Sequence, residues 1–414
     1  MAIMETLKTL VWILSSLLTI YGIYYAFMLI FTFLPLKERV AHGPKTKFAV
    51  VVAARNEEAV IGNLVDSLFQ QNYPRELYDV IVAPNNCRDN TKGVAEEHGA
   101  MIFEPKSVIR SKGDVLKELF ASLLRERPDY EAFVVFDADN VADPDFLRNM
   151  NSALVEGAEV AQGYRDSKNP YTTYMASCST IYYYMVNRFL NRPRNAIGLS
   201  GMINGTGFAV KADVLRALGG YNTRTLTEDI EFSTQVILSG RKVEWVPNAI
   251  TYDEQPEDFL TSWKQRKRWT LGLIQCGREY LGELLRNLTK GNFLQVFDFT
   301  MFHLGPLVQI LSIFSGLAIT SLSIVQVYYD QMTTTTLVLL AVGSTVLSYV
   351  GMTVVPMVLV ALEKRSLKKA WKGILTFGFF LMTWLPINVL CFIKPDTTWH
   401  EIKHKQKVSL NRKA

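Results

Sequence analysis

Cysteine is scarce in this chain, and its spacing excludes two structural roles. Only four cysteines occur among 414 residues, and none is part of a CxxC pair: Cys87, Cys178, Cys276 and Cys391. A disulfide framework or a cysteine-ligated zinc site needs a different pattern, with paired or closely spaced cysteines. Scattered, reduced thiols are instead typical of a protein that faces the cytoplasm.

We also expect no cleavable leader. The first apolar run, residues 9–34, is longer than the apolar region of a signal peptide, and no Ala-x-Ala-like site follows it. We therefore expect it to remain as a membrane anchor. Three further runs, 299–328, 335–362 and 374–393, also reach the roughly 20 residues that cross a bilayer. With 49% hydrophobic residues and a net charge of +5, the composition indicates a soluble domain joined to four membrane segments.

Positive charge is unevenly placed around the first run. Lys8 precedes it, whereas four basic residues follow: Lys37, Arg39, Lys45 and Lys47. The positive-inside rule therefore places the middle of the chain and the basic loop 363–372 in the cytoplasm. The basic tail 395–414 also favours the cytoplasm, which conflicts with three crossings after the soluble segment. Either the last run, interrupted by TWLP at 383–386, is re-entrant, or one run does not cross.

The soluble middle, residues 46–260, alternates short apolar runs with helical patterns. We predict strands at 48–54, 78–83, 100–104 and 132–136 and helices at 57–71 and 91–98. This alternation predicts a mostly parallel sheet covered by helices on both faces. Ligands of such sheets lie beyond the carboxyl ends of the strands, so the residues just past each strand are candidates for a site.

One strand end carries two acidic residues, in the sequence DADN at 137–140. Residues two apart on an extended chain face the same way, so Asp137 and Asp139 are expected to present two carboxylates at one point. Hard cations such as Mg²⁺ or Mn²⁺ prefer such oxygens and in turn bind a diphosphate. Acidic residues at a strand end can also be simple turn formers, and the motif alone does not separate the two interpretations.

The sequence LTEDIEF at 226–232 opens a predicted helix. Thr225 and Glu228 match a capping box, and acids in a first turn favour the helix dipole. The functional alternative makes Asp229 a general base. Taken alone, this motif favours capping.

The sequence QRKRW at 265–269 lies shortly before the second membrane segment. On a helix, Gln265, Arg268 and Trp269 share one face, while Arg266 and Lys267 point elsewhere. That face offers an amide, a guanidinium suited to phosphate oxygens and an aromatic plate suited to a sugar ring. The alternative is an interfacial helix with snorkelling basic residues and a belt tryptophan, which an isolated patch of this kind favours.

The order DxD, TED, QxxRW on one domain bracketed by membrane helices resembles the membrane-bound family 2 glycosyltransferases. This group contains cellulose, chitin, hyaluronan and poly-N-acetylglucosamine synthases, and the motifs cover about residues 48 to 270. The resemblance implies an α/β GT-A fold, with a Rossmann-like mixed sheet, plus transmembrane helices. It divides the chain into an anchor (1–45), a GT-A domain (46–260), interfacial helices with QxxRW (261–295), transmembrane helices (296–394) and a basic tail (395–414).

The resemblance also implies roles for single residues. Ala53, Arg55 and Glu57 of VVAARNEE are placed near the uridine, and Lys112 of SKGD reaches toward the diphosphate. Asp137 and Asp139 bind metal and nucleotide, Asp229 is the acceptor base, and four residues contact substrate: Glu228, Gln265, Arg268 and Trp269. The glycine-rich stretch 198–215 helps to line the acceptor site. The family usually has Asp after the second strand, where this chain has Asn85, so strict uridine selectivity is not implied.

The implied reaction is an inverting transfer from a nucleotide sugar, expected to be UDP-linked, with Mg²⁺ or Mn²⁺ as cofactor. The acceptor hydroxyl attacks opposite the departing diphosphate and forms a beta linkage. The expected product is a growing polysaccharide, with coupled translocation or an export subunit; the alternative is single addition to a lipid-linked acceptor. The expected location is the bacterial inner membrane with a cytoplasmic catalytic domain, and no nucleic-acid partner is expected.

The sequence HEIKH at 400–404 spells a zinc-protease signature. His400 and His404 have the required spacing on a helix, but the remaining histidines show no companion motif, so an Asp or Glu would have to supply the third ligand. The segment also lies in a short basic tail. A membrane zinc protease is therefore a remote alternative. A catalytically silent scaffold is a third, and three sets of polar residues directed at one pocket argue against it.

Overall fold

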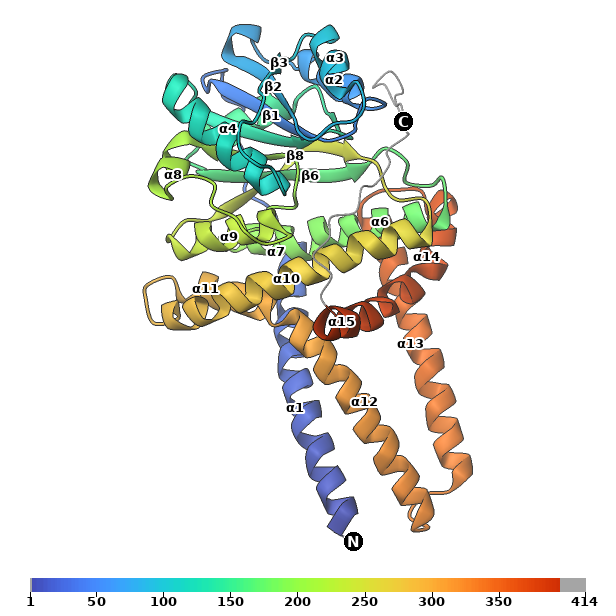
Figure 1. Ribbon diagram of the computed structural model, residues 1–414. Helices are drawn as coiled ribbons and strands as arrows, with labels where there is room; N and C mark the ends of the chain where they lie inside the picture. The colour runs from blue at the N-terminus through green and yellow to red at the C-terminus, as the bar shows by residue number, and fades with distance from the viewer. Residues whose placement is uncertain (1, 395–414) are drawn as a thin grey trace.

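The computed structural model describes residues 2–394, which form an α/β domain seated on long helices (Figure 1). The domain is built on one eight-stranded sheet. Its strands are β1 (Phe48–Ala54), β2 (Tyr78–Pro84), β3 (Met101–Ile102), β4 (Ala132–Asp137), β5 (Val141–Ala142), β6 (Val160–Ser167), β7 (Phe208–Lys211) and β8 (Val243–Asp253). The first, second and fourth strands lie where the apolar runs predict them.

The sheet is mixed, in the order β3-β2-β1-β4-β7-β6-β8-β5. Strands β3, β2, β1 and β4 run parallel, whereas β7 is antiparallel to both of its neighbours, β4 and β6. Ala53 at the end of β1 pairs with Ala83 on one side and Asp137 on the other. The carboxyl ends of three strands therefore meet at one level, as the sequence pattern predicts.

Alternating residues of β1 pack into two separate cores. Val50 and Val52 face a cluster with α2 (Ile61–Phe69) and α5 (Phe146–Val155). Ala49 and Val51 face a second cluster with α4 (Lys112–Glu126), α8 (Ala212–Ala217) and α9 (Glu228–Leu238). Burial on both faces explains why the strand reads as a continuous apolar run. The helices of the domain are α2 (Ile61–Phe69), α3 (Thr91–Glu97), α4 (Lys112–Glu126), α5 (Phe146–Val155), α6 (Tyr174–Met185), α7 (Arg192–Ala196), α8 (Ala212–Ala217) and α9 (Glu228–Leu238), with 3₁₀ turns η1 (Phe31–Phe33) and η2 (Arg75–Leu77) and a π-helical segment η3 (Val186–Asn191).

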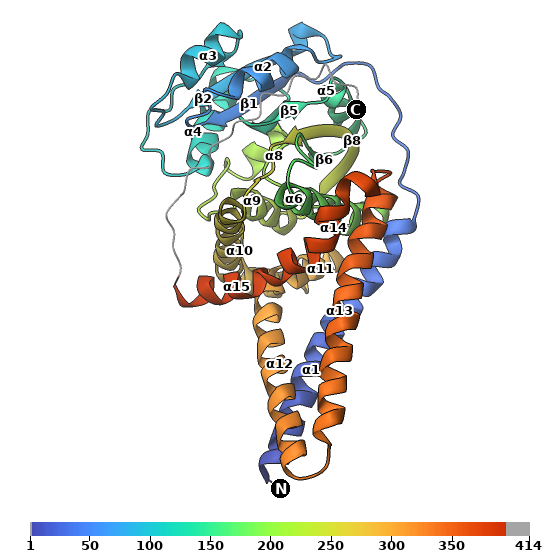
Figure 2. The same cartoon turned by 90° about the vertical axis from the view of Figure 1, so that its right-hand side faces the viewer.

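Long helices lie beneath the domain. They are α1 (Ala2–Ile30), α10 (Phe259–Asn287), α11 (Phe293–His303), α12 (Gly305–Tyr328), α13 (Thr334–Leu362), α14 (Leu367–Met382) and α15 (Trp384–Ile393). Within residues 2–394, four segments are long and apolar enough to cross a membrane, as expected. Three of them, α1, α12 and α13, project away from the sheet, whereas α14 and α15 stay close to α6 and α10 (Figures 1 and 2).

The fourth apolar segment is bent rather than straight. Buried Arg266 of α10 donates to the Phe380 carbonyl oxygen at 3.0 Å and to the Thr383 hydroxyl at 2.5 Å. The guanidinium thus satisfies a carbonyl at the end of α14, and a new helix starts at Trp384 in another direction. The interruption at 383–386 is therefore a bend held from the α10 side.

A buried ion pair joins the anchor to the domain. Arg194 of α7 donates two 2.8 Å hydrogen bonds to Asp298 of α11, which also accepts from Tyr24 of α1. We expect Asp298→Ala to lower the free energy of unfolding by about 3–5 kcal/mol, because a buried arginine loses its counter-charge. Chemical unfolding in detergent would measure this change.

Two further variants test the assignment of this effect to the buried charge. The double variant Arg194→Met with Asp298→Leu should lose less stability than Asp298→Ala, because it leaves no lone charge. Asp213→Ala removes an acid whose side chain is 90% exposed and should be near neutral. An Asp298→Ala loss no larger than that of Asp213→Ala would contradict the prediction.

Candidate active site

One cavity of about 910 Å³ runs from the carboxyl edge of the sheet to the membrane helices. All of the site residues expected from the sequence line it: Ala53, Arg55, Glu57, Asn85, Lys112, Asp137, Asp139, Glu228, Asp229, Gln265, Arg268 and Trp269. They come from six separate stretches of the chain. The tertiary structure therefore brings the expected residues to one place, and none of them lies elsewhere.

The loop after β1 is held away from helical geometry. Asn56 has a positive φ of 57°, and its side chain accepts a 2.8 Å hydrogen bond from the Arg88 backbone. The Glu57 backbone N–H donates to the Thr91 hydroxyl at 2.9 Å. These contacts delay the helix expected from residue 57 until Ile61 and leave the loop free to line the cavity. Asn85 is anchored beside it, since its amide N–H donates to the Ala54 carbonyl at 3.0 Å.

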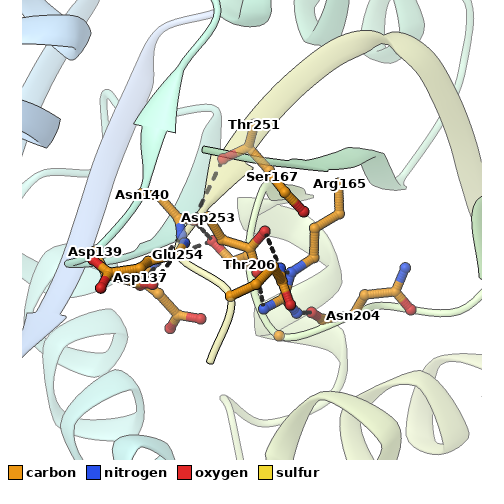
Figure 3. Close-up of polar contacts among 12 residues, drawn as sticks. Asp137, Asp139, Asn140, Arg165, Ser167, Asn204, Thr206, Thr251, Asp253 and Glu254 are labelled. Carbon is orange, nitrogen blue, oxygen red and sulfur yellow. Dashed lines mark hydrogen bonds and ion pairs between the residues drawn. The ribbon is translucent and has the colours of Figure 1, made fainter. Parts of the chain in front are cut away.

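The two aspartates converge through a turn. Strand β4 ends at Asp137, and the Asn140 backbone N–H bonds the Asp137 carbonyl at 3.1 Å. The expectation that extended alternation aligns them is therefore wrong in its geometry, although both still line the cavity. The amide oxygen of buried Asn140 accepts from Thr206 and Thr251, which fixes the turn against β7 and β8 (Figure 3).

The donor set at this turn suits a hard divalent cation. Asp137, Asp139 and Glu254 line the cavity, and their carboxylates are the oxygen ligands that Mg²⁺ and Mn²⁺ prefer. Within residues 2–394, no group of three or more His, Cys, Asp or Glu side chains is arranged to hold a metal alone. An ion bound here would therefore complete its coordination with oxygens of a substrate and water. His400 and His404 lie outside the described residues.

Lys112 links the two acidic motifs. Its ammonium contacts Asp137 at 2.5 Å, the Gly205 carbonyl at 2.6 Å and Glu228 at 3.6 Å. Burial alone would lower the pKa of Lys112, but the carboxylates of Asp137 and Glu228 outweigh it and raise that pKa. The Lys112 ammonium therefore stays positively charged among the carboxylates of the site.

The capping-box interpretation of Thr225 and Glu228 is wrong. Helix α9 begins at Glu228, and its N-cap residue is Thr227, whose side chain makes no capping hydrogen bond. Glu231 instead accepts from the backbone N–H groups of Arg224 and Thr225, at 2.8 and 2.7 Å. Glu228 is therefore left to face Lys112 and the cavity.

Asp229 has the protonation behaviour of a base poised near neutral pH. Burial raises the pKa of Asp229 to about 7, and the neighbouring Glu228 carboxylate adds to the shift. A Cβ atom placed on Gly205 would lie 3.5 Å from its carboxylate oxygen, so glycine keeps this side of the carboxylate open. Such a group can accept a proton from a hydroxyl that enters the cavity.

The QxxRW residues line the wall of the cavity formed by α10. Gln265, Arg268 and Trp269 all face it, as the helical spacing predicts, whereas Arg266 is buried against α14 and α15. Trp269 stacks on Tyr182 of α6, with ring centroids 6.0 Å apart and an interplanar angle of 18°. Tyr182 therefore fixes the aromatic plate expected to meet a sugar.

Sequence reasoning missed several lining residues, of which Arg165 is the most prominent. It pairs with Asp253 at 2.6 Å and donates to the Asn204 carbonyl at 2.6 Å (Figure 3). Its guanidinium also lies over the Tyr183 ring. Burial raises the pKa of Asp253 to about 6, although Arg165 opposes the shift. Arg165 lies near the end of β6, so the rule that ligands lie beyond strand ends could have identified it. No comparable pattern in the sequence identifies Tyr183.

The fold and the site together define a GT-A glycosyltransferase that uses a nucleotide sugar. The profile described as "Glycosyltransferase like family 2" matches residues 44–272, which is more than half of the chain. The chain therefore belongs to this family of glycosyltransferases.

Relatives and a solved structure agree with the family. "Probable glycosyltransferase YdaM" of Bacillus subtilis is 24% identical over 69% of this chain and 67% of its own. "Beta-monoglucosyldiacylglycerol synthase" of Nostoc sp. is 27% identical over 58% of this chain, and the match spans about half of that protein, 51%. "Mannosyltransferase PcManGT from Pyrobaculum calidifontis in complex with GDP-Man and Mn2+" superposes with a TM-score of 0.62 over 94% of this chain and 99% of its own, at 16% identity, and so shares the fold.

Proposed function

We propose that this protein is an inverting, metal-dependent glycosyltransferase that adds one sugar from a UDP-linked donor to a lipid acceptor in the membrane. The observation that carries the proposal is the shape of the cavity. It begins at Ala53 and Asn85 on the sheet and continues without interruption to Val355 of α13. A water-soluble donor and a membrane-borne acceptor can therefore meet at Asp229.

The donor end supplies the groups that a diphosphate requires. Asp137 and Asp139 would hold Mg²⁺ or Mn²⁺, which would neutralise charge on the leaving diphosphate. Lys112 and Arg268 line the same end and stabilise the negative charge that develops as the glycosidic bond breaks. Ala53, Arg55, Glu57 and Asn85 enclose the nucleoside. Because Asn85 stands where the family usually has an aspartate, a test of donors should include nucleotide sugars with bases other than uracil.

Asp229 performs the proton transfer in this proposal. Its carboxylate removes the proton of the acceptor hydroxyl while the hydroxyl oxygen forms a bond to the anomeric carbon. The bond from that carbon to the diphosphate breaks on the opposite face. Attack on the opposite face inverts the anomeric centre, so an alpha-linked donor yields a beta-linked product.

The membrane end favours a lipid over a growing polysaccharide. Its lining is mostly apolar and includes Leu29, Phe189, Phe302 and Val355. In the described part of the chain, the large side chains that α12 and α13 expose are apolar, which does not suit the lining of a hydrated pore. A growing polysaccharide needs such a pore to cross the membrane. A lipid head group needs only an opening between helices at the side of the cavity. The glycolipid product in the name of the Nostoc relative agrees with this choice.

Three crossings, by α1, α12 and α13, reconcile the charge pattern with the fold. With the α/β domain in the cytoplasm, α12 leaves and α13 returns, so α14 and α15 lie on the cytoplasmic face of the inner membrane. The 363–372 loop and the C-terminal end of α15 then both lie on the side that the positive-inside rule favours for the basic segments. Single addition to a lipid also makes an export subunit unnecessary.

A labelled-sugar assay tests the proposal. The purified chain in lipid vesicles is given UDP- and GDP-sugars with or without Mn²⁺, and the products are separated into organic and aqueous phases. We expect metal-dependent transfer of one sugar per acceptor from a UDP-sugar into the organic phase. A long aqueous polymer retained by the enzyme would instead establish the polysaccharide alternative.

A further inference from the structure

The cavity has a charged half and an uncharged half. All of its charged lining residues belong to the half near the sheet: Arg55, Glu57, Arg110, Lys112, Asp137, Asp139, Arg165, Glu228, Asp229, Glu254 and Arg268. The membrane half is formed by α1, η3, α12, α13 and α15, and no charged side chain of residues 2–394 lines it. The two halves therefore suit ligands of different charge.

Two amides lie together in the uncharged half. Asn388 of α15 donates a hydrogen bond to the side-chain oxygen of Gln309 on α12, and both residues line the cavity. Asn388 is only 1% exposed, and its own amide oxygen has no hydrogen-bond partner among the described residues. A buried acceptor without a donor is rare in proteins, which indicates that a ligand group supplies the missing hydrogen bond.

A lipid phosphate fits this half poorly. Arg266 is a buried cation of α10 near this region, but the residue is only 1% exposed, and its guanidinium lies 4.2 and 5.0 Å from the centroids of the Phe380 and Trp384 rings. It bonds Phe380 and Thr383 and does not line the cavity. Arg268 lines the cavity but belongs to the face of α10 that we assign to the donor diphosphate. A phosphate in the apolar half would therefore be desolvated without a counter-charge, which is unfavourable.

We propose that the acceptor is an uncharged lipid alcohol of the diacylglycerol type, positioned by Gln309 and Asn388. This inference rests on the proposed function and narrows its substrate class. The amide oxygen of Asn388 accepts a hydrogen bond from the polar group of the lipid. The acyl chains leave the cavity between α12 and α13. Trp384 is on the same helix as Asn388, and its ring centroid lies 5.1 Å from that of Tyr182. The head group would therefore lie next to the aromatic wall that leads to Asp229.

A choice between two acceptors tests the charge argument without any mutation. Vesicles contain either diacylglycerol or a polyprenyl monophosphate at equal mole fraction, and transfer from the labelled donor is measured in both. We expect kcat/KM for diacylglycerol to exceed that for the polyprenyl phosphate by about tenfold or more. Preference for the phosphate would overturn this inference and leave the lipid-acceptor function standing. Labelling of neither lipid, or of an aqueous polymer alone, would overturn both.

Variants of the amide pair test the positioning role. Asn388→Leu and Gln309→Leu should each raise KM for diacylglycerol by about tenfold. Sugar release from the donor without acceptor is measured in the same variants, as a separate readout of the charged half. The exchanged pair Gln309→Asn with Asn388→Gln keeps both amides and should recover most of the lost affinity.

A matched control lies on the same membrane helix. Gln326→Leu removes an amide from α12 at a position that does not line the cavity, and KM should stay at the wild-type value. If Asn388→Leu and Gln309→Leu gave the same KM as Gln326→Leu, the amide pair would have no part in acceptor binding. A loss of kcat with donor release impaired to the same extent would indicate misfolding of the cavity, and would also count against the assigned role.

Discussion

Replacing Asp229 with asparagine is expected to reduce kcat for sugar transfer by about 10²- to 10⁴-fold, because the amide cannot take the acceptor's proton. The side chain keeps its size, so donor binding should be retained. Nucleotide release in the presence of acceptor, measured alongside donor affinity, checks both parts of the expectation. Donor affinity that fell together with kcat would show that Asp229 acts in binding and would contradict its role as the base.

The same carboxylate should set the pH dependence. Because burial raises the pKa of Asp229 to about 7, the active, deprotonated form is half populated near pH 7. Below that value, kcat/KM should fall roughly tenfold per pH unit, and above it the profile should level off. Glu228→Gln removes a neighbouring negative charge that contributes to the shift, so the midpoint should move to lower pH. An unchanged midpoint in Glu228→Gln would contradict the assignment of this titration to Asp229.

Stability gives an independent control for the asparagine variant. The pKa of Asp229 lies above its ordinary value of 3.8 in the folded protein, so the folded state binds the proton more tightly than the unfolded state. The stabilising contribution is present at low pH and is lost as the pH rises through about 7. Above pH 7, Asp229→Asn should therefore be at least as stable as the wild type. Thermal unfolding in detergent at pH 8 measures this directly, and a lower melting temperature would indicate a structural fault.

The second large effect is expected at the metal motif. Asp139→Asn should reduce metal-dependent donor turnover by about 10²- to 10³-fold, because the leaving diphosphate loses charge stabilisation when an ion is held less well. A titration with Mn²⁺ should show saturation in the wild type and a much weaker response in the variant. Titration of Mn²⁺ binding in the presence of UDP provides a readout that does not depend on turnover.

An exposed acid supplies the matched control for this variant. Asp213→Asn also removes one negative charge from the domain, at a side chain that is 90% exposed and far along the chain from the motif. Its response to Mn²⁺ should equal that of the wild type. If Asp139→Asn and Asp213→Asn responded equally to the ion, Asp139 would have no part in holding it.

Local patterns were sufficient for the strands that carry the donor site. The apolar runs of β1, β2 and β4 predict both their positions and their ends, because a strand buried on both faces must be apolar throughout. The 3.6-residue repeat likewise predicts that Gln265, Arg268 and Trp269 share a face of α10. The polar residues just beyond those strands then follow from the rule on carboxyl ends.

Other features depend on partners that are distant in the chain. Thr225 and Glu228 match a capping box locally, but Glu231 takes the backbone N–H groups and Glu228 turns to Lys112, more than 100 residues earlier. The bend between α14 and α15 likewise needs Arg266. Nothing within a short window of sequence records either contact.

The fold class and the family could be predicted from the sequence alone, and the same motifs supply the residues proposed for the donor site, because all three depend on periodicity and on motifs that occur in a fixed order. The way in which the proposed site continues toward the membrane helices depends on the tertiary structure. The uncharged half of the cavity is assembled from α1, η3, α12, α13 and α15, whose lining residues look like ordinary membrane or core positions one by one. Gln309 and Asn388 become a candidate site only when folding places them side by side, since a hydrogen bond between distant residues has no local signature.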